Sequence, residues 1–173
     1  SAGVMRGYRN SPAQTAEAID PEGWLHTGDV ATIDQDGYVA IVDRKKELII
    51  NAAGKNMSPT NIEAAIQVEC GLIGSVIAIG DQRPYVTALV CLDPEASAGI
   101  DDAAALAQVE AAVERANAGL SRVEQIKKFK IVPNTWEAGG DELTPTMKLK
   151  RKPIAEKYSD LIDELYGTDD RRK

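Results

Sequence analysis

The chain has 173 residues, of which 43% are hydrophobic and 27% are charged, and its formal net charge is −7. A globular chain of this size holds one ordinary domain, or one small domain with a piece of another. The acidic balance and the lack of a face-wide basic stripe exclude a nucleic-acid groove, and no apolar run has the length of a transmembrane helix.

The two cysteines, Cys70 and Cys91, lie far apart, the first in a predicted helix and the second in a predicted strand. Unclustered thiols predict no metal site and fit a reducing, cytoplasmic environment. We expect both to be small buried hydrophobic residues. The chain begins Ser-Ala without a methionine or a secretory signal, which indicates a fragment of a longer protein.

The first part of the chain is predicted to be irregular to residue 23 and to end in a β-hairpin. Thr15–Ile19 has the composition of one helical turn. Val30–Asp34 and Tyr38–Val42 alternate apolar and polar residues, and Asp-Gly lies between them. Because glycine accepts a positive φ at low cost, this dipeptide is a strong hairpin signal.

A helix is predicted next, with Ser58 as its N-cap and Pro59 as its first residue, running to about Val68. Its inner face consists of Ile62, Ala65 and Ile66. One short strand is predicted before this helix, at Leu48–Ile50. Three strands are predicted after it, at Ile73–Ile79, Val86–Leu92 and Ile126–Val132.

Further helices are predicted in the second half of the chain. Residues 101–118 carry acidic residues in the first turn and one apolar stripe, formed by Leu106, Val109, Val113 and Ala116. Residues 121–124 match a capping box, which predicts a short helical turn. A final helix from about Pro153 to Tyr166 is expected to bury Ile154, Tyr158, Leu161, Ile162 and Leu165.

This order of helices and strands predicts a compact α+β domain over residues 47–167, with a polar loop at residues 133–147 and a disordered tail at residues 168–173. Two strands alone cannot bury a core, so the hairpin in residues 1–43 is assigned to a different domain. Residues 44–46 would then join the two parts.

Two residues near the hairpin are candidates for chemistry. Asp29 follows Thr-Gly at the start of a strand, where its carboxylate can accept the hydroxyls of a ribose or cap the backbone amides of a turn. His26, the only histidine, has no cysteine or carboxylate at ligand spacing. We interpret it as a packing residue at the strand entry rather than a zinc ligand or a base.

Two basic segments have alternative interpretations. Residues 44–47, Arg-Lys-Lys-Glu, form either a solvated linker or a hinge that absorbs a rotation between domains. Lys148 lies in the segment Thr-Pro-Thr-Met-Lys-Leu. It is either a surface lysine or a point charge that a mobile loop delivers to a phosphate as negative charge develops.

Three motifs carry a resemblance to a known family. Residues 22–46, from Glu-Gly-Trp-Leu-His-Thr-Gly-Asp to Val-Asp-Arg-Lys-Lys, resemble the signature of fatty acyl-CoA synthetases in the adenylate-forming superfamily. Residues 143–151, Leu-Thr-Pro-Thr-Met-Lys-Leu-Lys-Arg, are similar to the form found in long-chain acyl-CoA ligases, and residues 3–19 also resemble that family. The resemblance covers nearly the whole chain except its tail.

The resemblance implies roles for five residues. Asp29 corresponds to the aspartate that binds the ribose hydroxyls of AMP, and Arg44 to the arginine beside it. Lys46 falls on the hinge position. Gly54 matches the glycine beside which the pantetheine arm of CoA passes, a role that requires the absence of Cβ. Lys148 matches the lysine that enters the active site for adenylation and leaves it for thioester formation.

The implied reaction joins a fatty acid to CoA in two steps. The carboxylate attacks the α-phosphate of ATP, with Mg²⁺, and gives acyl-AMP and pyrophosphate; the CoA thiol then displaces AMP. The resemblance also implies a cytoplasmic enzyme and leaves open its peripheral contact with a membrane.

The glycine-rich phosphate loop of the family is not present in these residues, and neither is the core that forms the adenine site and the acyl tunnel. We therefore expect the C-terminal portion of such a ligase, inactive by itself. An adenylation domain that loads a carrier protein and a non-catalytic α+β binding module are the alternatives.

Overall fold

The structure is a computed structural model that describes residues 3–167, and the chain divides between Glu47 and Leu48 into two compact units. The first unit contains helix α1 (Pro12–Ala18) and an antiparallel pair of strands, β1 (Asp29–Ile33) and β2 (Val39–Arg44). The predicted hairpin is therefore confirmed. Its turn is closed by the Asp34 carboxylate, which accepts the amides of Asp36 and Tyr38 at 2.9 Å.

Helix α1 is longer than the single turn expected at Thr15–Ile19, and it begins with Pro12. Proline suits the first helical position because its φ is already helical and its missing amide has no partner there. The Thr15 hydroxyl links this helix to the residues before it: it donates to the Ser11 carbonyl at 2.9 Å and accepts the Tyr8 amide at 2.9 Å.

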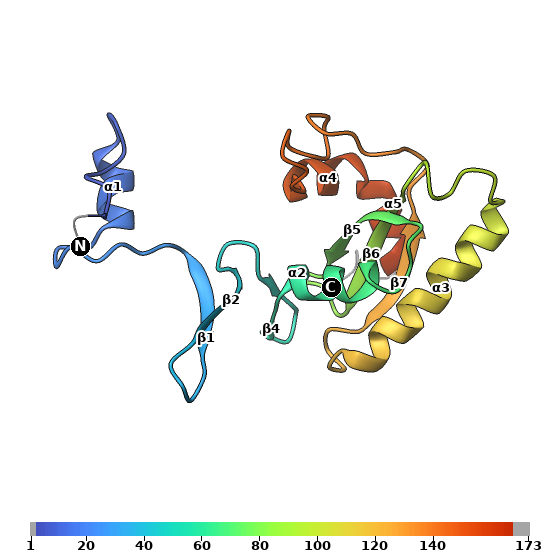
Figure 1. The fold of residues 1–173 in the computed structure, drawn as a ribbon, viewed down its shortest axis with the longest axis horizontal. Helices are drawn as coiled ribbons and strands as arrows, with labels where there is room; N and C mark the ends of the chain where they lie inside the picture. Colours follow the sequence, from blue (N-terminus) through green and yellow to red (C-terminus); the bar gives the residue numbers. More distant parts are fainter. Residues whose placement is uncertain (1–2, 168–173) are drawn as a thin grey trace. The chain divides into compact units, whose positions relative to one another are not determined.

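The second unit is built on a three-stranded sheet with the order β5–β6–β7 (Figure 1). Strands β5 (Ile73–Ile79) and β6 (Val86–Leu92) are antiparallel and match their predicted bounds. Strand β7 (Ile126–Ile131) runs parallel to β6, so helix α3 (Asp102–Gly119) forms the crossover between them. A second, two-stranded sheet pairs β3 (Ile49–Ile50) with β4 (Asn56–Met57).

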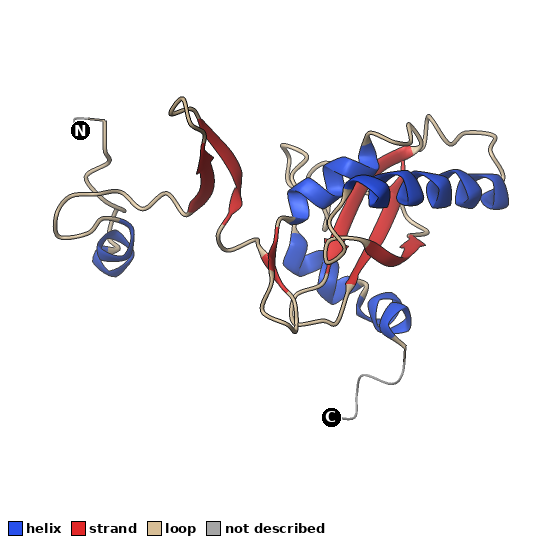
Figure 2. Cartoon of the chain, turned by 90° about the horizontal axis from the view of Figure 1, so that it is seen from below, coloured by secondary structure: helices blue, strands red, loops and turns tan. Residues whose placement is uncertain are grey.

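Both faces of the three-stranded sheet are covered. Helices α2 (Pro59–Gln67) and α3 pack on one face, and α3 lies across the strands in Figure 2. Helices α4 (Arg151–Lys157) and α5 (Ser159–Tyr166) pack on the other. Alternate residues of β6 therefore enter two separate cores: Val86, Ala88 and Val90 the first, and Leu89 and Cys91 the second.

Helix α2 begins at a serine cap and buries one face in the first core. The Ser58 hydroxyl accepts the Asn61 amide at 3.1 Å and caps the helix, as predicted, and Ile62 and Ile66 are fully buried. Ala65 is only partly buried. Glu63, not expected in the interior, is also buried, and its carboxylate accepts the amide of Ala78 in β5 at 2.8 Å.

The predicted stripe of α3 was wrong at one position. Leu106 is 42% exposed, whereas Ala105 and Ala112 are buried beside the predicted Val109, Val113 and Ala116. The helix is capped as its sequence indicates, because the Asp101 carboxylate accepts the Ala104 amide at 2.8 Å. In an alanine-rich helix, small residues complete the buried face and allow the larger leucine to lie at its edge.

The predicted helical turn is present as a single turn, because the amides of Glu124 and Gln125 both donate to the Ser121 carbonyl, at 2.9 and 3.1 Å. The prediction of one continuous final helix was wrong. The final helix is two helices, interrupted at Tyr158, whose backbone has φ −106° and ψ 23°. The Tyr158 hydroxyl accepts a hydrogen bond from Trp136 Nε1 and donates one to Glu142 in the second core. The tail at residues 168–173 lies outside the described residues.

We expect Ile66→Ala to lower the free energy of unfolding by about 2–5 kcal/mol, because it opens a cavity at a fully buried position. Leu106→Ala, in the exposed part of α3, should cost less than half as much. Urea unfolding followed by circular dichroism measures both values, and an equal loss would contradict the assignment of the buried face.

Candidate functional site

The carboxylate of Asp29 and the guanidinium of Arg44 form an ion pair at the open end of the hairpin. Asp29 is the first residue of β1, Arg44 is the last residue of β2, and their Cα atoms are register partners. The Arg44 Nε lies 2.7 Å from the Asp29 Oδ1. Arg44 Nη1 also donates to the Thr27 carbonyl at 3.3 Å. The structure thus brings together the two residues that the resemblance assigned to the ribose.

A β-bulge decides which residue faces Asp29. The pairing is regular near the turn, where Ile33 faces Val39 and Ala31 faces Ile41. If this register continued, Asp29 would face Asp43. Instead the register shifts between Val30 and Ala31, so β2 contains an extra residue and Asp29 faces Arg44. The shift replaces two like charges with an opposite pair. Asp43 is buried, and its Oδ1 accepts the Arg44 amide at 2.7 Å.

The turn-capping interpretation of Asp29 is not what the structure shows. Among the described residues, its carboxylate accepts no backbone amide, and the pair with Arg44 is its recorded contact. Its own amide donates to the Thr27 hydroxyl at 3.2 Å. The Asp29 side chain is 26% exposed and that of Arg44 is 62% exposed. A pair this exposed adds little stability, and solutes can reach the Asp29 carboxylate.

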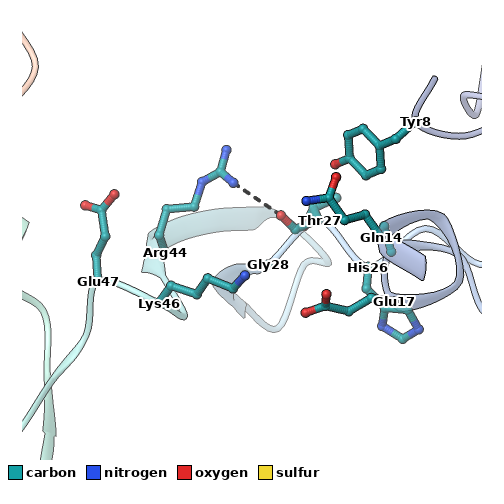
Figure 3. A pocket seen from close by; sticks show the side chains of 10 residues that line it. Tyr8, Gln14, Glu17, His26, Thr27, Gly28, Arg44, Lys46 and Glu47 are labelled. Atoms are coloured by element: carbon teal, nitrogen blue, oxygen red, sulfur yellow. Dashed lines mark hydrogen bonds between the residues drawn. The ribbon is translucent and has the colours of Figure 1, made fainter. Parts of the chain in front are cut away.

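A hollow of about 590 Å³ lies beside this pair within the first unit (Figure 3). Arg44, the last residue of β2, and Lys46, in the turn after it, contribute positive charges to its lining. Glu17 of α1 and the residues Thr27 and Gly28 before β1 also line it. Hydroxyl, carboxylate and cationic groups around one hollow suit a polar ligand with several hydroxyl or phosphate oxygens.

His26 was expected to pack at the strand entry, and this prediction was wrong. Its side chain is 63% exposed and its Nε2 lies 3.2 Å from the Asp20 carboxylate. The Asp20 carboxylate also accepts the Trp24 amide at 2.8 Å. That backbone hydrogen bond, together with the contact to His26, holds the pKa of Asp20 below its ordinary value.

The segment expected to be a hinge begins inside a strand. Arg44 completes β2, and residues 45–47 form a turn closed by the Glu47 amide, which donates to the Arg44 carbonyl at 2.9 Å. The Lys45 amide donates to the Gly28 carbonyl at 2.8 Å and so fixes the turn to the base of β1. The pivot at Lys46 concerns motion and stays a prediction.

Gly54 lies in the tight loop between β3 and β4, in the second unit. The Asn51 side chain accepts the amides of Ala53 and Lys55, at 3.0 and 2.9 Å, and the Gly54 amide donates to the Asn51 carbonyl. Gly54 has φ +76°, a conformation that favours glycine. A Cβ built there meets no atom within 4 Å, so the loop conformation alone requires glycine and the surface above it is open.

Lys148 is exposed on a short loop with buried ends. Leu143 and Leu149 form an isolated antiparallel bridge, and Leu143 is 1% exposed in the second core. Thr144 closes the loop between them: its amide donates to the Lys148 carbonyl at 2.8 Å, and its hydroxyl accepts the Lys148 amide at 3.0 Å. The lysine is thus presented on an anchored turn rather than on an irregular polar segment.

The tip of this loop has an unusual backbone. The Met147 amide donates to the Thr144 carbonyl at 2.9 Å and closes a β-turn over residues 144–147. Pro145 is the second residue of this turn, where proline is common. Met147 has φ +61°, a left-handed conformation that costs a residue with Cβ roughly 1–2 kcal/mol. Such strain persists where the surrounding structure determines the backbone, and it is often found at functional sites.

A buried carboxylate holds the loop on the side before Lys148. Glu142 accepts a hydrogen bond from the Tyr158 hydroxyl at 2.9 Å and pairs with Lys157 at 2.8 Å. The Tyr158 hydroxyl in turn accepts from Trp136 Nε1 at 3.1 Å. Burial acts to raise the pKa of Glu142, but the hydrogen bonds from Lys157 and Tyr158 outweigh it and hold that pKa below its ordinary value. Neither Glu142 nor this network was singled out from the sequence.

The two cysteines are buried, as expected. Burial raises the pKa of the Cys91 thiol, whose sulfur also accepts the Trp136 amide at 3.3 Å. A protonated, enclosed thiol of this kind has a packing role. Across residues 3–167 no three His, Cys, Asp or Glu side chains are grouped to hold a metal ion, and within the same residues no helix has the length and apolarity to cross a membrane.

The family model described as "AMP-binding enzyme C-terminal domain" matches residues 46–170. The chain therefore belongs to this family of C-terminal domains of AMP-binding enzymes. A relative from Mycobacterium tuberculosis, named "Putative fatty-acid--CoA ligase fadD11", is 57% identical over 96% of this chain and 32% of its own length. The mouse long-chain-fatty-acid–CoA ligase ACSBG1 is 38% identical over 94% of this chain and 27% of its own length. The chain thus spans about a third or less of these curated relatives.

Solved structures agree with the fold class. The A domain of carboxylic acid reductase from Segniliparus rugosus, in complex with AMP and a co-purified carboxylic acid, has a TM-score of 0.81 and 26% identity, covering 94% of this chain and 26% of that one. ATP-bound MatB from Rhodopseudomonas palustris has a TM-score of 0.62 and 29% identity, covering 91% of this chain and 29% of that one. The predicted α+β C-terminal domain of an adenylate-forming enzyme is confirmed.

We expect Glu142→Gln to destabilise the second unit by about 1.5–3 kcal/mol near neutral pH, because it removes charge-assisted hydrogen bonds at a buried site. Since the pKa of Glu142 is lowered by folding, its contribution is present above the unfolded glutamate pKa of about 4.3 and is lost as the pH falls through the lower folded value. The difference in urea midpoint between wild type and variant should therefore shrink below about pH 4.3.

Asp141→Asn is the matched control, because Asp141 binds the same Lys157 at 3.0 Å but its side chain is 77% exposed. It should change the midpoint little at any pH. A Glu142→Gln difference that does not vary with pH would contradict the role of the ionised carboxylate.

Proposed function

We propose that the chain is the C-terminal part of a fatty-acid–CoA ligase, which converts a fatty acid and ATP to acyl-AMP and then transfers the acyl group to CoA. The observation that carries this proposal is the exposed Lys148 on an anchored, strained loop in a domain of the AMP-binding enzyme family. The names of the curated relatives support the acyl substrate and the CoA acceptor. A family of enzyme domains also supports catalysis over a free-standing binding module.

In the first half-reaction, the pair in the first unit would hold the nucleotide. One oxygen of Asp29 is engaged by Arg44 Nε, so the carboxylate is fixed in orientation and keeps acceptor capacity for the two ribose hydroxyls. Arg44 is itself fixed by the Thr27 carbonyl. Mg²⁺ would arrive with ATP as part of the substrate.

Lys148 would stabilise the transition state of adenylation. The carboxylate of the fatty acid forms a bond to the α-phosphorus while the bond to the pyrophosphate oxygen breaks, and negative charge builds on the phosphate oxygens. An ammonium group placed at those oxygens lowers the barrier more than it strengthens substrate binding. Its loop is exposed and short, which lets it enter a site and leave it without rearrangement of the core.

For the second half-reaction, we propose that the domain rotates about Lys46. Lys148 would leave the site, and the loop around Gly54 would line the path of the CoA pantetheine. The open surface above Gly54 and the rigid Asn51 loop support this assignment. The CoA thiol then loses its proton and its sulfur bonds to the acyl carbon. AMP departs with the electrons of the broken bond between the acyl carbon and the phosphate oxygen.

An adenylation domain that loads a carrier protein is the second candidate. It is favoured by one observation, the TM-score of 0.78 to the A-PCP didomain of carboxylic acid reductase from Segniliparus rugosus, at 27% identity. Assay of the full-length protein with CoA and with a phosphopantetheinylated carrier protein separates the candidates. Thioester formed on CoA alone supports the ligase, and thioester formed only on the carrier would overturn it.

We expect Lys148→Ala in the full-length protein to slow acyl-AMP formation by about 10²–10³-fold, since loss of one such donor costs about 2.7–4 kcal/mol of transition-state stabilisation. Thioester formation from supplied acyl-AMP should be nearly unchanged. Pyrophosphate release measures the first step, and acyl-CoA formation from acyl-AMP the second.

Lys152→Ala is the control for the loss of a lysine in the same segment. Its side chain is 87% exposed, and it forms only a long ion pair with Glu156, at 3.9 Å. This variant should keep both half-reactions. An equal loss of both half-reactions in Lys148→Ala would contradict the role proposed for Lys148.

A polypeptide of only these 173 residues should release no pyrophosphate from ATP when given palmitate and Mg²⁺. Of the proposed catalytic site it supplies Asp29 for the ribose and Lys148 for the phosphate. It corresponds to 32% of the length of a relative that is 57% identical. Pyrophosphate release above the enzyme-free rate would contradict the expectation that the catalytic site needs residues beyond this chain.

A further inference from the structure

An ion pair between Glu63 and Arg151 joins the end of the Lys148 loop to the body of the second unit. Arg151 Nη1 lies 2.5 Å from Glu63 Oε1, and Nη2 lies 2.8 Å from Oε2. Two parallel hydrogen bonds of this kind fix direction as well as distance. The Glu63 side chain is 9% exposed and that of Arg151 is 23% exposed, so solvent competes little for either group.

Glu63 is itself fixed on the opposite side. It projects from α2, and its Oε1 also accepts the Ala78 amide at 2.8 Å. Ala78 belongs to β5, an edge strand of the three-stranded sheet. The carboxylate therefore ties three parts of the unit together: the helix α2, the edge of the sheet and the first residue of α4.

Arg151 begins α4 three positions after Lys148, and both residues between them are held. Leu149 bridges Leu143 and packs against the second core. Lys150 donates from its amide to the Glu142 carbonyl at 2.7 Å and from Nζ to the Gly140 carbonyl at 2.8 Å. The end of the loop after its exposed tip is thus held by Leu149, by Lys150 and by the Glu63–Arg151 pair.

Stability alone is a weak reason for such a pair, because the cost of desolvating two buried charges often offsets their attraction. Geometry is the stronger reason. We propose that the Glu63–Arg151 pair positions Lys148: it sets where the lysine stands relative to α2 and β5, so that rotation of the domain brings the ammonium group to the same point each time. Arg151 and Glu63 act through the loop and do not touch the substrate. This inference rests on the adenylation role proposed for Lys148.

The test is Arg151→Met in the full-length protein, with the two half-reactions measured separately. Acyl-AMP formation should fall on the order of 10–100-fold, because a displacement of about 1 Å in a reacting group has effects of that size. Thioester formation from supplied acyl-AMP should stay close to wild type. Arg151→Lys, which keeps the charge but not the fork of two donors, should fall between wild type and Arg151→Met in the first half-reaction.

Arg115→Met is the matched control. Arg115 also binds a carboxylate through Nε and a backbone carbonyl, both of Glu69 and both at 2.7 Å, but it lies in α3 and has no link to the Lys148 loop. It should leave both half-reactions unchanged. A loss in Arg115→Met equal to that in Arg151→Met would show that any broken ion pair of the domain has this effect, and would overturn the proposal.

Equal losses of both half-reactions in Arg151→Met, or no loss in either, would also overturn it. If Arg151→Met does not fold, Glu63→Gln decides, because its amide oxygen can still accept the Ala78 amide while the charge opposite Arg151 is removed. If a folded Glu63→Gln protein forms acyl-AMP at the wild-type rate, the positioning role is overturned. A loss of acyl-AMP formation without a loss of thioester formation would support it. Failure of the proposed function is seen separately, as a wild-type protein that makes no acyl-AMP or a Lys148→Ala variant that makes it at the normal rate.

Discussion

Strand β6 is buried along both of its faces, and the architecture of the second unit follows from this constraint. A strand without a solvent-exposed face needs a helical layer on each side. Helices α2 and α3 supply one layer, and they lie between β4 and β7 in the chain. The other layer comes from α4 and α5, after the last strand. The loop with Lys148 is therefore the connection that leads the chain into a layer that the sheet requires.

This position explains how one short loop can be exposed at its tip and fixed at its ends. Glu142 and Leu143 before the tip, and Leu149 and Arg151 after it, are held by side chains of helices that the core orients. The strain at Met147 is tolerated because these contacts determine the backbone on both sides. A flexible loop would spread the lysine over many positions and lose the entropic advantage of a preset geometry.

Local signals predicted the elements that depend on local interactions. Asp-Gly marked the hairpin, Ser-Pro the start of α2, and a run of apolar residues the buried β6. The errors occurred where the outcome depends on distant residues. Tyr158, at the break in the final helix, is hydrogen-bonded to Trp136 and Glu142, which lie outside that helix. In α3, alanines gave too little contrast to define the limits of the buried face, and Leu106 was counted in it although its side chain lies at the edge.

The candidate site shows the same division. Asp29, Arg44 and Lys148 were identified through motif resemblance, since single residues of these types are usually surface charges. The pairing of Glu63 with Arg151 had no signal in the sequence, because a glutamate in an amphipathic helix and an arginine 88 positions away give no sign of their contact. Only the packing of α2 against β5 and the return of the chain at α4 bring them together.

The bulge in the hairpin gives chain length a meaning separate from residue identity. One extra residue in β2 turns a repulsion between Asp29 and Asp43 into an attraction between Asp29 and Arg44. Deletion of Val42 would remove the bulge and keep this exchange, because regular pairing would then set Asp29 opposite Arg44. Loss of the bulge in a hairpin of unchanged length would instead set Asp29 opposite Asp43. In comparisons among related chains, a one-residue gap in this hairpin is therefore compatible with the Asp29–Arg44 pair, whereas a hairpin of this length needs the bulge to form it.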